Sequence, residues 1–136
     1  MKLHRGRLID HVHLRAKNLS ATQGFYRALL GALGIEPVVT DRHLQVDELW
    51  IDALGADKSQ ATHLHLAFQA ADEEMVRHAH EAACAAGGRD NGAPGERDYH
   101  PGYYAAFLLD PDGNNIEIVF HGEAKRSADS VEIEFG

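Results

Sequence analysis

The chain contains one cysteine and four prolines, and it has no long hydrophobic run. A single cysteine cannot form an internal disulfide, and the position of Cys84 among alanines on an expected helix favours a small core residue. No stretch approaches the roughly 20 apolar residues that span a membrane. The basic start at residues 1–7 is not followed by the apolar segment of a signal peptide. We therefore expect a cytoplasmic protein.

Positive charge is also scarce: the chain has 13 Lys and Arg residues against 21 Asp and Glu residues, which gives a formal net charge of -8. Such a chain repels nucleic-acid phosphates and anionic lipid heads, so neither nucleic acid nor a membrane is an expected partner. Hydrophobic residues make up 44% and charged residues 25% of the chain, which is typical of globular proteins. With 136 residues we expect a single domain, residues 1–136, with its own core.

The two halves of the chain share landmarks that recur at an offset of 54 residues. The recurring pairs are His11 and His65, the expected helix starts near Leu19 and Glu73, and Gly34 and Gly88. Each half predicts a strand, a helix and three short strands, so the expected fold class is α+β with two βαβββ modules in tandem. The modules cover about 8–55 and 61–122, and a tail follows at 123–136. Chance similarity is the alternative, because the halves agree in landmarks more than in letters.

Local signals predict where the elements begin and end. The first helix carries a capping box at Ser20 and Gln23 and an apolar stripe that ends at Leu33. The second helix has an N-cap at Asp72 and stops at Gly87-Gly88. The remaining strands are expected at about 35–40, 42–47, 48–54, 89–93, 103–110 and 114–121.

Turn residues and alternation mark three further segments. Residues 110–114 (Asp-Pro-Asp-Gly-Asn) predict a tight hairpin turn before the last strand of the second module. An inserted loop at about 89–102 is rich in Gly and Pro, and it is either a lid over a site or a solvated connector. His100 and Tyr103 near its end favour a lid. In the tail, apolar residues alternate with glutamates at 131–135, which predicts an arm that pairs with a sheet edge or a partner subunit, or a frayed end.

Three strands carry potential metal ligands on their polar faces. His11, His65 and Glu117 each lie on the polar side of an alternating strand, and the two histidines stand at the repeat offset. Taken singly, each histidine is better explained as a hydrogen-bonded or exposed residue, and the glutamate as a solvated strand position. Together, two imidazoles and one carboxylate leave a divalent ion with open coordination positions, which suits polarising a substrate oxygen or activating O₂. We therefore predict a metal site.

Neighbours of this triad are candidates for the rest of the site. His13 and His63 lie two residues from the histidine ligands, and they either reach the cavity as proton carriers or face solvent. The same alternatives hold for His121, four residues after the glutamate. Trp50 is a candidate cavity wall and Asp52 a candidate fourth ligand. The candidate catalytic groups are Glu117, His13, His100 and Tyr103, the candidate substrate-binding residues are Trp50, Asp52, His63, Tyr104 and His121, and surface positions are expected for His4, His43, His78 and His80.

The chain resembles the vicinal oxygen chelate superfamily, which includes glyoxalase I, fosfomycin-resistance enzymes, extradiol dioxygenases and bleomycin-binding proteins. The resemblance covers about residues 8–122 and is carried by Ile9-Asp10-His11-Val12, Phe25-Tyr26, His65-Leu66-Ala67-Phe68 and, most specifically, Asp110-Pro111-Asp112-Gly113-Asn114-Asn115-Ile116-Glu117. It implies a mixed sheet curled as a half-barrel around a metal cleft, with the helices packed outside, and a homodimer. It also implies that His11, His65 and Glu117 chelate a divalent ion (Fe, Mn, Ni, Zn or Co), and that reactions pass through an oxyanion bound to that ion.

The resemblance does not identify the substrate. Glyoxalase I takes a fourth ligand from the last strand of the first module, where this chain offers only Asp52 or the non-ligating Trp50. Extradiol dioxygenases place a catalytic tyrosine ten residues before the ligand glutamate, where this chain has Phe107. We find no match to the potassium-binding loop of fosfomycin thiol transferases. Residues 89–104 are similar to small bacterial members labelled only as glyoxalase-like.

Two functions compete on these residues. The first is a metal-dependent lyase, isomerase or dioxygenase-like enzyme, acting on a small molecule that chelates the ion through adjacent oxygens. The alternative is a metal-independent binding or sequestering protein of the bleomycin-resistance type, in which Trp50, Tyr103 and Tyr104 stack on a planar ligand. The triad favours the enzyme, because a sequestering cavity does not need three convergent ligands. A structural or regulatory domain has only the tail to support it.

Overall fold

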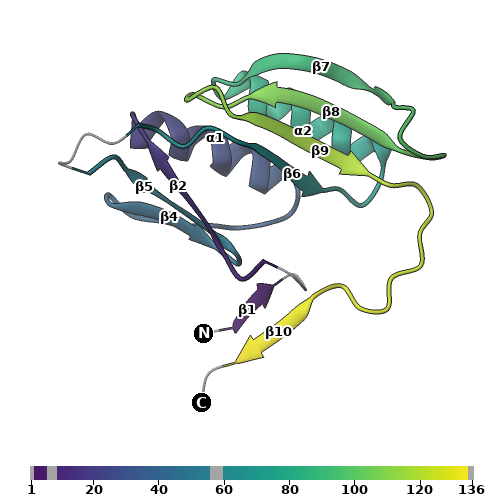
Figure 1. The fold of residues 1–136 in the computed structure, drawn as a ribbon, viewed down its shortest axis with the longest axis horizontal. Coiled ribbons are helices and arrows are strands. Elements are labelled where there is room, and N and C mark those ends of the chain that lie inside the picture. The colour runs from purple at the N-terminus through teal and green to yellow at the C-terminus, as the bar shows by residue number, and fades with distance from the viewer. Residues whose placement is uncertain (1, 6–8, 56–59, 135–136) are drawn as a thin grey trace.

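The computed structural model describes residues 2–5, 9–55 and 60–134. Two modules follow each other along the chain, each with a strand, a helix and three further strands (Figure 1). The elements are β2 (Val12–Ala16), α1 (Leu19–Ala32), β3 (Val38–Val39), β4 (His43–Val46) and β5 (Leu49–Ala53) in the first module, and β6 (His65–Gln69), α2 (Glu73–Ala85), β7 (Arg89–Glu96), β8 (Tyr104–Leu109) and β9 (Asn115–Phe120) in the second. The predicted α+β class and the tandem βαβββ modules are confirmed.

Each module forms its own four-stranded mixed sheet, and no closed barrel forms among the described strands. The strand orders are β2-β5-β4-β3 and β6-β9-β8-β7. The first pair in each sheet is parallel and the other pairs are antiparallel. The two sheets therefore share one topology, as expected of a repeated module.

One hydrophobic core joins the two modules through α1. This helix contacts β4 and β5 of the first sheet, while its Phe25 and Tyr26 reach the second module. The Tyr26 ring centre lies 6.4 Å from that of Phe68 in β6. The apolar faces of both sheets enter the same core, with Leu14, Ala16, Leu44, Leu49 and Ile51 from the first and Ala106, Leu108, Ile116 and Ile118 from the second. Both helices pack on the apolar sides of the sheets in this shared core, so the polar face of each sheet lies on the side away from the core.

The start of α1 differs from its prediction. The N-cap is Asn18, whose side chain accepts a hydrogen bond from the backbone N–H of Ala21, so Ser20 lies inside the helix. Gln23 does not close a capping box but donates its amide to the carbonyls of Thr40 and His43. Asparagine is as good an N-cap as serine, and the extended backbone of Asn18 starts the helix earlier. For α2, the predicted N-cap at Asp72 is confirmed by its bond to the N–H of Met75.

The strand expected at about 89–93 is confirmed, and it extends to residue 96, so the loop expected over 89–102 is corrected to a shorter one. Residues 89–96 form β7, which pairs with β8 through register shifts between Asp90, Gly92 and Gly95. Because β7 is the edge strand of its sheet, it tolerates Pro94 and the glycines at its bulges. The loop that remains, at 97–103, is half as long as expected.

The tail pairs with the N-terminus. β10 (Val131–Glu134) runs antiparallel to β1 (Lys2–Arg5), with Arg5 opposite Val131. This two-stranded sheet lies apart from both modules (Figure 1). The tail therefore pairs as an arm, one of its expected alternatives. Its partner, β1, was not expected to be a strand. Phe135, the last residue of the predicted alternation, lies outside the described residues.

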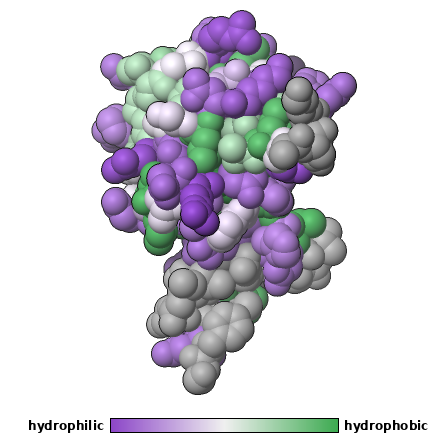
Figure 2. All heavy atoms as spheres, turned by 90° about the vertical axis from the view of Figure 1, so that its left-hand side faces the viewer, coloured by the Kyte–Doolittle hydropathy of each residue, from purple (hydrophilic) through white to green (hydrophobic). Residues whose placement is uncertain are grey.

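The surface seen in Figure 2 is mainly hydrophilic, with a few hydrophobic residues between polar ones. This agrees with the acidic composition and with a core that takes up most of the large apolar side chains. Within the described residues, no helix has both the length and the apolar character needed to cross a membrane.

Candidate functional site

Glu117 is a buried carboxylate on the polar face of the second sheet. Its side chain is only 4% exposed, although strand β9 carries it toward the face that lacks a helix. One carboxylate oxygen, Oε1, lies 2.9 Å from Nε2 of His65, and the other, Oε2, accepts a hydrogen bond from the hydroxyl of Tyr103. A buried charge is stable only when it is paired and hydrogen-bonded, and here both oxygens have a partner.

Register explains why these groups meet. β6 runs parallel to β9 with Ala67 opposite Glu117, so His65, two residues earlier, lies on the same face. Tyr103 ends the loop at 97–103, whose ends are joined by a hydrogen bond from the Arg97 N–H to the Tyr103 carbonyl. Burial, and then the hydrogen bond and negative charge of Glu117, raise the pKa of Tyr103 to about 12. Tyr103 therefore stays protonated at neutral pH and donates to the carboxylate.

The predicted hairpin turn fixes both β9 and the start of β6. Asp110 is 2% exposed and accepts four hydrogen bonds, from the backbone N–H groups of Asp112 and Asn114, the Tyr26 hydroxyl and the Asn114 side chain. The side-chain oxygen of Asn114 in turn accepts from the N–H of Leu64, at 2.8 Å. This hydrogen-bonded turn, the anchor of the site, therefore holds the start of β9, which carries Glu117, next to the start of β6, which carries His65. The sequence identified the turn but not this role of its side chains.

The loop at 97–103 brings further predicted residues to Tyr103. Nε2 of His100 lies 2.9 Å from Nδ1 of His121. The ring centres of these two histidines lie 5.3 and 5.1 Å from that of Tyr103, and the ring centre of Tyr99 lies 4.9 Å from it. Five predicted residues, His65, Glu117, Tyr103, His100 and His121, therefore gather on the second module.

The polar face of the first sheet holds a separate group. Nε2 of His13 lies 2.7 Å from Oδ1 of Asp52, and Trp50 donates its indole N–H to Oδ2 at 3.4 Å. Although burial by itself raises the pKa of Asp52, the hydrogen bonds from His13 and Trp50 and attraction to His13 and Arg15 bring it below its usual value. His43, expected at the surface, stacks on Trp50 with ring centres 4.2 Å apart. This face offers a hydrogen-bonded histidine–carboxylate pair beside an aromatic wall.

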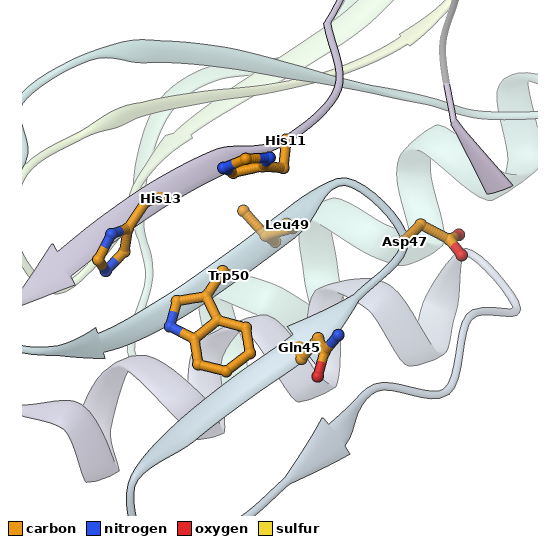
Figure 3. A pocket seen from close by; sticks show the side chains of 6 residues that line it. All are labelled: His11, His13, Gln45, Asp47, Leu49 and Trp50. Atoms are coloured by element: carbon orange, nitrogen blue, oxygen red, sulfur yellow. The ribbon is translucent and has the colours of Figure 1, made fainter. Parts of the chain in front are cut away.

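His11 belongs to this first group. It borders a cavity of about 370 Å³ (Figure 3), whose lining is His11, His13, Gln45, Asp47, Leu49 and Trp50. Its Nδ1 lies 2.7 Å from Asp10, and its side chain is 63% exposed. In the register of its sheet, Trp50 holds the position that Glu117 holds in the second sheet, since Trp50 pairs with His13 as Glu117 pairs with Ala67. The first module therefore has no carboxylate at that position.

One chain does not gather the predicted triad. In the described ranges, no group of three or more His, Cys, Asp or Glu side chains is close enough to hold a metal ion. His65 and Glu117 are together, but His11 lies on the other sheet, whose polar face points away. The physical reason is the position of α1, which packs the two modules back to back.

The other predicted residues lie away from both groups. Tyr104 is on the opposite face of β8, where its hydroxyl accepts from Arg77 of the α2 side. His63 is exposed just before β6. Cys84 is half-buried, and burial, followed by the charge of Asp90, raises the pKa of its thiol, as fits a packing residue.

Sequence reasoning missed Arg97, whose guanidinium carbon lies 5.4 Å from the ring centre of Phe107. The same ring lies 6.0 Å from that of His65. A lone arginine in a glycine-rich segment carries no sequence signal for such a position.

Comparisons with known proteins agree with this fold. The family model for the glyoxalase/bleomycin resistance protein/dioxygenase superfamily matches residues 8–118. A solved glyoxalase/bleomycin resistance protein from Albidiferax ferrireducens T118 is 31% identical, with a TM-score of 0.69 over 83% of this chain and 98% of that one. A glyoxalase-related enzyme from Fulvimarina pelagi shares the fold at 20% identity and a TM-score of 0.67, over 96% and 99% of the two chains.

Lactoylglutathione lyase from Agrobacterium tumefaciens also shares the fold, at 20% identity and a TM-score of 0.57 over 82% of this chain and 91% of that one. No curated protein matched the chain. The family model covers most of the chain, and it includes both polar faces described above. The chain therefore belongs to the glyoxalase/bleomycin resistance protein/dioxygenase superfamily.

Proposed function

We propose that the protein is an enzyme that uses a divalent metal ion, one of Fe, Mn, Ni, Zn or Co, to act on a small molecule with two adjacent oxygens. The observation that carries this proposal is the buried Glu117 carboxylate with the His65 imidazole against it. A buried carboxylate is costly, and a site that needs its charge explains why the fold retains it.

The spacing of these two groups suits a shared ion. Ligand bonds of about 2.0–2.2 Å at right angles place two donor atoms roughly 3 Å apart. Nε2 of His65 and Oε1 of Glu117 are 2.9 Å apart. An imidazole nitrogen and a carboxylate oxygen are also the donor types that such ions take in proteins. The two side chains therefore fit as two of three ligands.

We infer that the third ligand, His11, comes from a second copy of the chain. In one chain the two polar faces are back to back, yet each carries part of the predicted ligand set. A two-fold dimer that lays the first sheet of one copy across the second sheet of the other completes two equivalent sites. The exposure of His11 leaves it accessible for this contact.

The chain's own residues hold and move protons around this site. When bound, the ion polarises the substrate oxygens. Tyr103 remains protonated and holds the Glu117 carboxylate in place. Nδ1 of His100 donates to the carbonyl of Pro101, because a carbonyl only accepts. With both rings neutral, Nε2 of His100 then accepts from Nδ1–H of His121, which leaves Nε2 of His121 as a base. We assign proton transfer to His121, beside Tyr103.

A second candidate function is metal-independent sequestration of a planar molecule. It is favoured by the His43–Trp50 stack next to the cavity on the first sheet. In that case Trp50 supplies the flat surface and the His65–Glu117 pair has no part in binding.

Metal analysis of the purified protein separates the two functions. We expect about one ion per chain after incubation with each of the five ions, because a two-fold dimer has as many sites as chains. His65→Ala should lose the ion, whereas the control His63→Ala, on an exposed residue two positions earlier, should keep it. Absence of stoichiometric metal in the wild type, or full metal content in His65→Ala, would contradict the metal-dependent function.

A further inference from the structure

One row of register partners crosses the polar face of the second sheet. Ala67, Glu117 and Phe107 stand opposite one another on β6, β9 and β8, and Gly92 of β7 is opposite Phe107. The guanidinium of Arg97 lies over the Phe107 ring, at the β7 end of this row. The row thus has a carboxylate and an imidazole toward one end, an aromatic ring in the middle and a cation at the other.

No protein carboxylate neutralises this cation. Nη2 of Arg97 donates to the carbonyl of Ala93 at 2.8 Å, and Nη1 donates to the carbonyl of Glu96 at 3.2 Å. Among the residues that the structure describes, no carboxylate lies within ion-pair distance of Arg97. A full positive charge therefore remains on the polar face of a chain whose net charge is -8.

Two glycines make room for the guanidinium. A Cβ at Gly95 would lie 3.2 Å from Nη1 of Arg97. A Cβ at Gly92 would lie 3.1 Å from the Phe107 ring and 3.4 Å from Nη2 of Arg97. These contacts are tighter than most side chains make, so a side chain at either position would press on the Arg97 guanidinium or on the Phe107 ring. The two glycines of β7 therefore leave space for Arg97 in its observed place.

The distances set the size of a molecule that uses both ends of the row. β9 and β7 are two strand spacings apart, which is about 10 Å between backbones. The Phe107 ring contacts the His65 ring at 6.0 Å and the Arg97 guanidinium at 5.4 Å, so it forms the floor between them. A molecule of metabolite size, with an apolar or aromatic middle, spans this floor.

We propose that Arg97 binds an oxyanion of the substrate, a carboxylate first of all, while the adjacent oxygens at the other end of the substrate reach His65 and Glu117. This rests on the proposed function for the position of the adjacent oxygens. The planar fork of an arginine matches a carboxylate in two parallel hydrogen bonds. The substrate class is thus a small acid with its two adjacent oxygens remote from the acid group. The competing explanation is that Arg97 only ties together the bulges of β7 through Ala93 and Glu96.

A pair of probes that differ only in charge separates these explanations. Protocatechuate carries two adjacent hydroxyls and a carboxylate at opposite ends of one ring, and protocatechuamide replaces the carboxylate with a neutral amide. Isothermal titration calorimetry of metal-loaded wild-type protein should show about tenfold tighter binding of the acid. Arg97→Gln should bind both probes alike, with its affinity for the amide unchanged. The control Arg27→Gln, on an exposed position of α1, should retain the wild-type preference.

The wild type decides the matter by itself, even if Arg97→Gln does not fold. Equal affinities for the two probes, or binding of neither, overturn the inference. Equal weakening of both probes in Arg97→Gln would show that Arg97 only supports the strand, and this also overturns it. Metal content is measured separately. Failure of the metal analysis with the acid preference intact removes the proposed function alone, whereas full metal content without the preference removes this inference alone.

Discussion

Replacing Asp110 with asparagine tests whether the β8–β9 turn anchors the site. The side chain keeps its shape but loses its charge and one acceptor. The Asp110 carboxylate accepts four hydrogen bonds, and two of these, from Tyr26 and the Asn114 amide, meet at the same oxygen. If the new amide group occupies that position, the Tyr26 hydroxyl can turn and accept. The Asn114 amide can also turn, but its oxygen then leaves the N–H of Leu64.

The substitution therefore leaves one buried donor without a partner, in addition to weakening the remaining bonds. An unpaired buried donor costs about 1–3 kcal/mol, and a hydrogen bond to a neutral acceptor is about 1 kcal/mol weaker than one to a charge. We expect Asp110→Asn to lower the free energy of unfolding by about 2–4 kcal/mol.

Urea unfolding followed by circular dichroism measures this loss. With an m value of about 1.5–2 kcal/mol/M, a loss of 3 kcal/mol lowers the midpoint by about 1.5–2 M. The control Asp112→Asn changes a neighbouring residue whose side-chain oxygen accepts only a 3.2 Å bond from the N–H of Lys17, and should stay within about 0.5 kcal/mol of wild type. A midpoint for Asp110→Asn within about 0.3 M of wild type would refute the anchor argument.

Three further predictions concern the core and the metal. Burial, followed by the charge and hydrogen bond of Asp110, raises the pKa of Tyr26 well above its usual value. The stability that its hydroxyl contributes is therefore present below pH of about 10 and lost above it. In urea unfolding the wild type should lose more stability than Tyr26→Phe between pH about 9 and 11, and equal losses would count against this. Gly88→Ala places a Cβ 2.7 Å from the Phe25 ring and should lower the free energy of unfolding by about 1–3 kcal/mol. The control Gly31→Ala has open space around it and should be neutral or stabilising. Similar unfolding midpoints for the two variants would contradict this prediction. Metal content after dialysis should fall between pH about 7 and 5, because imidazole ligands must be neutral, and full retention at pH about 4 would contradict histidine ligands.

Strand alternation was enough to predict the halves of the site. The period of two places His65 and Glu117 on polar faces whatever the rest of the chain does, and the turn at 110–114 carries its own signal. The N-cap at Asp72 was equally local. Asn18 and Ser20 are both residue types that cap helices well, so the sequence alone could not show which of them begins α1.

What sequence reasoning could not supply depends on contacts between distant segments. The sequence shows that α1 has an apolar stripe. Only the folded chain shows that Phe25 and Tyr26 of this stripe pack against the second module, so that both sheets share one core. The same holds for β1, which gains a partner only in β10, more than a hundred residues away. In β7 the glycines resemble loop signals, and only the folded chain shows that Gly92 lies against the Phe107 ring of β8.

The central claim, a metal site shared between two copies, is tested most directly by a heterodimer. His11→Ala and Glu117→Ala chains, each unable to complete a site in a homodimer, are co-expressed with different tags and the mixed dimer is isolated. One of its two sites then combines the intact His11 of one chain with the intact His65 and Glu117 of the other, so metal analysis should find about half the wild-type content. A mixed dimer without metal, beside a wild type that binds it fully, would contradict the claim.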